Sequence, residues 1–82
     1  MPEITRFYGI IIRMFYKEHN PPHIHIEYGE KKGIIDIRIG TMTDGDLPPK
    51  ALSLVKEWTS AYKEELLDMW EDQKIRRLPP LE

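Results

Sequence analysis

The spacing of apolar residues changes near residue 45, and this change limits the folds open to the chain. Before it, apolar and polar residues alternate and many are β-branched or aromatic, which is typical of strands with one covered face. After it, apolar residues recur every three or four positions, which is typical of an amphipathic helix. The sequence therefore predicts an α+β fold with two layers, a sheet first and a helix last.

Turn residues divide the first part of the chain into strands of an antiparallel meander. Proline lacks an amide donor, so the pair Pro21-Pro22 ends the pairing of the first strand. A glycine-bounded turn over residues 29–33 then separates the second and third strands. We expect three strands, over residues 7–16, 23–28 and 34–39, with a short fourth strand between residues 40 and 45 as the alternative.

The second part of the chain predicts one long C-terminal helix packed on that sheet. Asp46 precedes Pro48 and Pro49, as expected at a helix start. The helix should span residues 48–73, followed by a tail over residues 75–82. Its length of ~38 Å exceeds the ~33 Å of a ten-residue strand, so we expect either a break near Lys63 or an overhanging end that contacts a partner.

Length and composition limit the class of protein. The chain has 82 residues, which predicts a single domain over residues 1–82. It has no cysteine, which excludes disulfides, thiolate metal sites and thiol nucleophiles. The chain has a net charge of −2, whereas a general nucleic-acid-binding protein usually has an excess of basic residues. No apolar run approaches the ~20 residues of a membrane span, and no signal peptide is evident, so a cytoplasmic location is expected.

The strand over residues 23–28 carries the candidate site. His23, His25 and Glu27 share one face, and the alternating isoleucines share the other. Pairing isoleucine with isoleucine across the first two strands sets Arg13 opposite His25. The same rule applied to the second and third strands sets Arg38 opposite His25. We therefore expect Arg13, His25 and Arg38 in one row on the uncovered face of the sheet.

Two guanidinium groups beside an imidazole suit the binding of a phosphate, and histidine exchanges protons near neutral pH. These residues predict a metal-independent ribonuclease. Arg13 and Arg38 would hold the phosphate. His23 and His25 would transfer protons, and Glu27 would orient an imidazole or act as the base.

Two other interpretations of the same face stay open. His23 and His25 lie ~6.5–7 Å apart along the strand, which suits a divalent metal site with His19 or Glu27 as a further ligand. Alternatively, the charges form an ordinary solvated face that serves solubility and cross-strand pairing. The ribonuclease hypothesis needs no cofactor, whereas the second hypothesis needs a divalent metal.

Several motifs resemble a small bacterial family known as domain of unknown function 4160. They are residues 4–14 (ITRFYGIIIRM), 19–29 (HNPPHIHIEYG), 47–49 (LPP) and 54–58 (LVKEW). The family motif positions would be Arg6, Arg13, His19, Pro21, Pro22, His23, His25 and Trp58. Members of the family are often encoded beside a small protein of the domain of unknown function 2442 type, which implies a toxin–antitoxin-like pair.

The resemblance thus implies two functions of different classes. The first is an RNA-acting toxin that uses the Arg/His face. The second is a non-enzymatic, antitoxin-like protein that binds the small protein encoded nearby through a sheet edge or a helix end. A histidine metal-binding module is the third alternative. Exposed edges of a short sheet would also allow a homo-oligomer.

Overall fold

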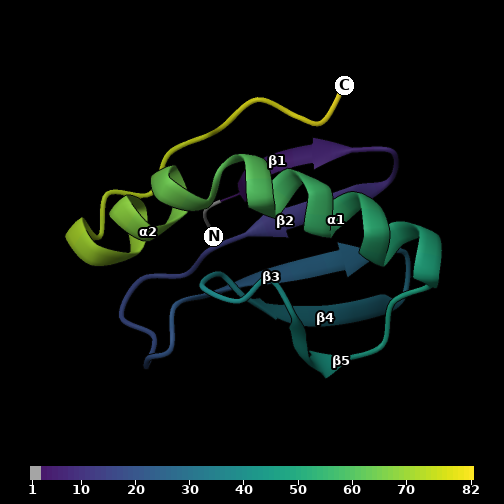
Figure 1. Cartoon of the computed structure of the whole chain (residues 1–82), viewed down its shortest axis with the longest axis horizontal. Helices are drawn as coiled ribbons and strands as arrows, with labels where there is room; N and C mark the ends of the chain where they lie inside the picture. Colours follow the sequence, from purple (N-terminus) through teal and green to yellow (C-terminus); the bar gives the residue numbers. More distant parts are fainter. Residues whose placement is uncertain (1–2) are drawn as a thin grey trace.

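Five antiparallel strands form one sheet in the order β1-β2-β3-β4-β5, and two helices cover one face of it (Figure 1). The computed structural model describes residues 3–82. The α+β class, the antiparallel sheet and the helical layer are confirmed, whereas three or four strands and a single helix are not. The elements are β1 (Glu3–Phe7), β2 (Ile10–Arg13), β3 (His23–Tyr28), β4 (Lys31–Asp36), β5 (Met42–Gly45), α1 (Pro49–Ala61) and α2 (Lys63–Asp72).

The single first strand expected over residues 7–16 is in fact a hairpin of β1 and β2. Tyr8 and Gly9 turn the chain with φ of 50° and 80°, and Phe7 pairs with Ile10 across the turn. Two successive residues with positive φ form the tight turn that suits a twisted hairpin. Asparagine or aspartate usually precedes the glycine in such turns, so the pair of tyrosine and glycine did not indicate a turn in the sequence.

The register between β3 and β4 also differs from the expectation, because the connecting turn is shorter. Residues 29–30 alone turn the chain, and β4 begins at Lys31. His25 consequently pairs with Ile34 and not with Arg38, which lies beyond the end of β4. The predicted register between β2 and β3 is confirmed, since Arg13 pairs with His25.

A break at Tyr62 divides the expected helix over residues 48–73 into α1 and α2. Tyr62 has φ −112° and ψ 20°, yet its amide donates to Trp58 O at 3.1 Å and its carbonyl accepts from Leu66 N at 2.9 Å. A break near Lys63 is therefore confirmed, and α1 starts with a proline at its first turn as predicted. Neither helix is long and apolar enough to cross a membrane.

The core lies between the sheet and the helices. Tyr8 and Ile39 fall within the strands expected over residues 7–16 and 34–39, but they are 64% and 67% exposed, because Tyr8 lies in the hairpin turn and Ile39 follows the end of β4. The buried apolar residues are Ile4, Phe7, Ile10, Ile12, Met14, Ile24, Ile26, Ile35, Ile37, Leu47, Ala51, Val55, Trp58, Leu66, Met69 and Trp70.

The C-terminal tail returns to the edge of the sheet formed by β1. Leu78 N donates to Ile4 O at 2.9 Å, and Arg77 Nη1 lies 3.2 Å from a Glu3 carboxylate oxygen. A hydrogen bond from Arg6, assisted by Arg77 and opposed by partial desolvation, lowers the pKa of Glu3 to about 2. These contacts shield part of one sheet edge from pairing with another chain.

Gly45 lies where β5 closely approaches the backbone of β4, so a larger residue there would displace the backbone. Its φ is +96°, and a Cβ there would lie 2.3 Å from the Lys32 carbonyl oxygen. We expect Gly45→Ala to lower the free energy of unfolding by ~3 kcal/mol or more, because strain and a backbone clash add. Gly29→Ala is the control, since Gly29 has φ +60° with open space around it and should cost only ~1 kcal/mol. Equal losses in urea denaturation would contradict this account.

Candidate metal centre

Strand β3 presents its polar side chains on the face opposite to the buried isoleucines. Ile24 and Ile26 are buried, whereas the side chains of His23 and His25 are 15% and 27% exposed. Both imidazoles are therefore partly shielded but still reachable from solvent. The alternation of the sequence placed these two residues on this face correctly.

A glutamate that the sequence analysis missed joins the two histidines. Glu18 Oε1 lies 2.7 Å from His25 Nε2 and 3.2 Å from His23 Nε2. The potential ligand atoms of the three residues all lie within 4.8 Å of one another. His19 and Glu27, the two alternatives expected for a further ligand, are not part of this cluster, and His19 is exposed. Glu18 comes from the irregular segment between β2 and β3, whose path no periodicity predicts.

The backbone carbonyl of Pro21 determines where one hydrogen lies on the His23 ring. His23 Nδ1 lies 2.8 Å from the carbonyl oxygen of Pro21, which can only accept, so Nδ1 carries a hydrogen. In a neutral imidazole, Nε2 then carries a lone pair; it lies 3.2 Å from Glu18 Oε1, which is hydrogen-bonded to His25 Nε2. A positive charge close to these atoms, from a proton or a metal ion, would favour their approach.

Aromatic packing fixes the orientation of both imidazoles. The ring of His23 lies 5.2 Å from that of His25 and 5.1 Å from that of Trp70, measured between centroids. Phe15 contacts His25 edge-on at 4.6 Å, and Trp70 Nε1 donates to Asn20 Oδ1 at 3.1 Å. These contacts restrict the rotamers of the two histidines, so the cluster is preorganised.

Glu27 and Arg13, both expected to act at the site, bind each other. Arg13 Nε donates to Glu27 Oε2 at 2.8 Å, with side chains 18% and 31% exposed. Glu27 also pairs with Lys32 across the sheet. The carboxylate of Glu27 is thus bound to an arginine, and it is not part of the cluster of Glu18 with the two histidines.

Arg38 is far from its expected place in a row with Arg13 and His25, so that row is wrong. It is exposed in the loop after β4, next to Lys56 and Ser60 of α1. Asp36 Oδ1 accepts from the backbone amide of Arg38 at 2.8 Å and so holds this loop. Because β4 ends before Arg38, the residue never enters the ladder beside β3.

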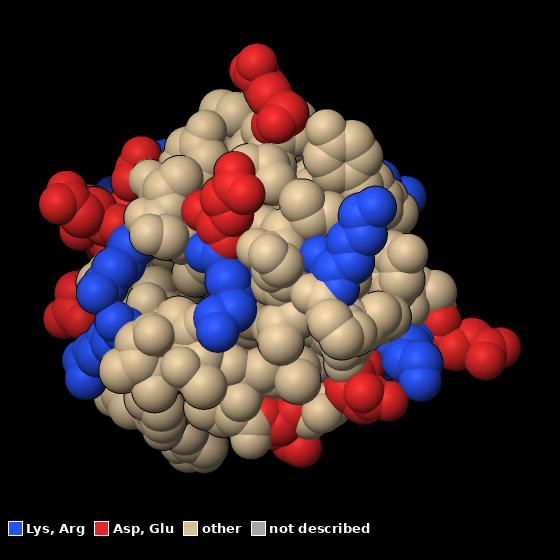
Figure 2. Space-filling view, turned by 45° about the vertical axis from the view of Figure 1, so that its right-hand side comes forward, with Lys and Arg blue, Asp and Glu red and all other residues tan. Residues whose placement is uncertain are grey.

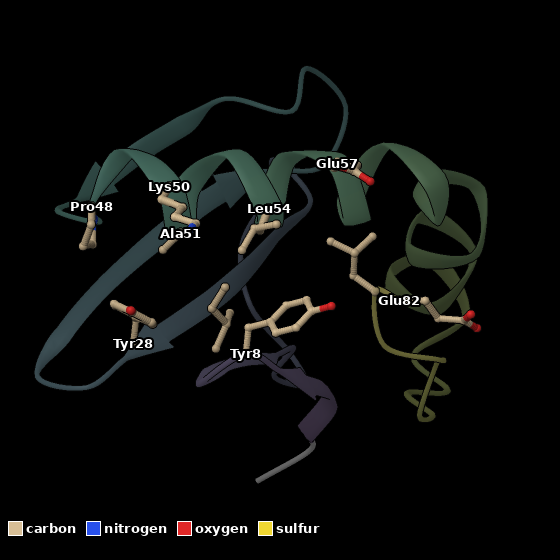
Figure 3. A pocket seen from close by; sticks show the side chains of 10 residues that line it. Tyr8, Tyr28, Pro48, Lys50, Ala51, Leu54, Glu57 and Glu82 are labelled. Carbon is tan, nitrogen blue, oxygen red and sulfur yellow. The ribbon is translucent and has the colours of Figure 1, made fainter.

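A mostly apolar hollow of about 510 Å³ lies at the other end of β3 (Figure 3). Tyr8 and Tyr28 come from two hairpin ends and lie across from Ala51 and Leu54 of α1. The C-terminal residue Glu82 completes its lining. None of the expected site residues reaches this hollow.

Charged side chains are mixed on the face shown in Figure 2, where basic groups alternate with acidic groups and wide uncharged areas. This distribution agrees with the net charge of −2. On this face no continuous basic surface of the kind that binds nucleic acid is present.

A family model described as Domain of unknown function (DUF4160) matches residues 9–71, which are 63 of the 82 residues. The chain belongs to this family. No curated protein and no solved structure matches it significantly. Glu18, His23 and His25 all fall within the matched range, so this cluster lies inside the DUF4160 domain.

The proton positions in this DUF4160 domain can be tested by imidazole ¹⁵N NMR at neutral pH without added metal. We expect the ring of His23 to be either the Nδ1–H tautomer or the doubly protonated imidazolium, because the Pro21 carbonyl requires a hydrogen on Nδ1. His19→Gln removes the signals of the exposed histidine and simplifies assignment. A His23 ring protonated only at Nε2 would contradict this geometry.

Proposed function

We propose that this chain is a metal-binding module that holds one divalent transition-metal ion, Zn²⁺ in the first instance, at Glu18, His23 and His25. Two imidazole nitrogens and one carboxylate oxygen form the ligand set of many catalytic zinc sites and of non-haem iron sites. The observation that carries this proposal is the convergence of one Glu18 carboxylate oxygen and two imidazole nitrogens, all within 4.8 Å of one another.

The distances support a metal with little rearrangement. Bonds of ~2.0–2.1 Å to a tetrahedral zinc place the ligand atoms ~3.4 Å apart. The contacts of Glu18 Oε1 with His25 Nε2 and His23 Nε2, at 2.7 and 3.2 Å, therefore lengthen by less than ~1 Å. A cation would replace the proton between His25 Nε2 and Glu18 Oε1 and would be attracted by the same carboxylate.

The surroundings of His23 also suit a ligand histidine. Metal-bound imidazoles usually donate their second ring N–H to a carbonyl or a carboxylate, which fixes the tautomer and strengthens the ligand. The Pro21 carbonyl makes this contact with His23 Nδ1 at 2.8 Å. Packing against Trp70 holds the ring in the same orientation, so little entropy is lost when a metal binds.

Three protein ligands leave a coordination position for a water molecule or a substrate atom. The side chains of His25 and Glu18 are 27% and 29% exposed, so small molecules can reach this position. A bound Zn²⁺ would supply Lewis-acid chemistry and a water that ionises near neutral pH.

The separation of Arg13 and Arg38 favours this proposal over an RNA-acting toxin. The toxin hypothesis depended on two arginines beside His25, and Arg38 pairs with neither β3 nor His25. Glu27, the other proposed base, is bound to Arg13. What supports chemistry on this face is the cluster of Glu18 with the two histidines.

The proposal is tested by titrating chelator-treated protein with Zn²⁺ in a calorimeter and by thermal denaturation. We expect one ion per chain and a higher melting temperature, because a ligand at 100 times its Kd stabilises the folded state by ~2.7 kcal/mol. Glu18→Gln and His23→Ala should each weaken binding by more than ~100-fold, because each removes or weakens one of three ligands.

His19→Ala is the matched control, since His19 is exposed and lies beside Glu18 in the same loop. It should bind Zn²⁺ with unchanged stoichiometry and affinity. Unchanged binding by His23→Ala, or an equal loss in His19→Ala, would show that zinc binds elsewhere and would overturn the proposal.

A further inference from the structure

A second group of polar side chains lines a hollow where the loop after β4 meets the end of α1. The hollow has a volume of about 240 Å³. Its polar lining comes from Arg38 in the loop, Lys56, Thr59 and Ser60 on α1, and Lys63 at the start of α2. None of these residues belongs to the metal centre, and no carboxylate lines the hollow.

The three cations of this hollow are Arg38, Lys56 and Lys63. Within residues 3–82, the ion pairs use other basic residues, and none involves these three. Three positive charges thus gather at this hollow although the chain has a net charge of −2. Like charges gathered in this way repel one another, and an anion between them removes that cost.

Thr59 adds a separate observation that points to a ligand. Its residue is 1% exposed, and its Oγ1 is the buried side-chain polar atom that lacks a hydrogen-bond partner in the described part of the chain. An unsatisfied buried hydroxyl is costly, so such groups usually have a role. Thr59 lines the same hollow as the three cations, next to the Ser60 hydroxyl.

The local structure holds these groups in place. Lys56, Ser60 and Lys63 follow one another at intervals of four and three residues, which places them on one side of the helical segment. On the other wall, the Asp36 carboxylate accepts from the amides of Arg38 and Ile39, at 2.8 and 3.3 Å. The loop that carries Arg38 is thus braced, and its guanidinium is presented from a fixed backbone.

We propose that this hollow binds a phosphate group, either as free inorganic phosphate or as the terminal group of a small phosphorylated molecule. Arginine and lysine pair with the charged oxygens, and Arg38 offers the planar fork that suits a tetrahedral oxyanion. The hydroxyls of Ser60 and Thr59 donate to the remaining oxygens. Three cations match a phosphate dianion better than a singly charged carboxylate.

Chelator-treated protein is titrated with inorganic phosphate by calorimetry at constant ionic strength, with chloride as the balancing anion. We expect saturable binding of one phosphate per chain. Lys56→Ala should weaken it by about tenfold, because one charged hydrogen bond is lost. Lys74→Ala, which removes an exposed lysine outside the hollow, should leave the affinity unchanged.

Thr59→Val separates a ligand-binding role from a structural one. It should weaken phosphate binding, yet leave the melting temperature in phosphate-free buffer equal or higher, because it removes an unpaired buried hydroxyl without changing the shape of the side chain. A fall in the phosphate-free melting temperature with unchanged phosphate affinity would assign Thr59 a purely structural role and overturn its part in the site.

Two further measurements identify the ligand and show whether phosphate binding depends on the proposed metal centre. Tighter binding of adenosine 5′-monophosphate than of phosphate supports a phosphorylated small molecule, and the reverse order supports free phosphate. His23→Ala should bind phosphate as the wild type does. Absence of saturable binding, or an equal loss of affinity in Lys74→Ala, would overturn the proposal.

Discussion

Burial of alternate residues in β3 is the constraint on which the rest of the structure depends. Ile24 and Ile26 are almost completely buried, because the helices cover their face of the sheet. In a strand, neighbouring side chains point to opposite faces, so this burial directs His23 and His25 to the other side. The segment between β2 and β3 then needs only to bring one carboxylate to this pair, and Glu18 supplies it. The hydrophobic core thus determines where the polar cluster can form.

The sequence predicted the features that follow from periodicity and missed those that follow from loops. The register of β2 with β3 was correct: Ile12 pairs with Ile26, and a slip by one residue would have turned the isoleucines to the other face. The register of β3 with β4 was wrong, because two turns of different length both bury isoleucines and only the shorter one forms. That single difference moved Arg38 from the face of β3 to the end of α1. Glu18 was missed because it lies in an irregular segment, where spacing gives no direction to a side chain.

Residues that the sequence analysis assigned to a single site belong to two separate proposed sites in the structure. His23 and His25 were expected to act together with two arginines on a phosphate. In the structure the histidines lie with Glu18, a set that attracts a cation, whereas Arg38 lies with two lysines, a set that attracts an anion. Their ligand preferences are opposite in sign and involve no shared residue. Each proposed site can therefore be altered by substitution without removing a residue of the other.

X-ray absorption at the zinc edge of the loaded protein tests the central claim most directly, because it reports the atoms bound to the metal. The account predicts a first shell of nitrogen and oxygen atoms at ~2.0–2.1 Å, together with the outer-shell scattering of two imidazole rings. Loss of one imidazole from the spectrum of His23→Ala, but not from that of His19→Ala, would place the ion at the cluster. A spectrum without imidazole scattering, or one that His23→Ala leaves unchanged, would contradict the account.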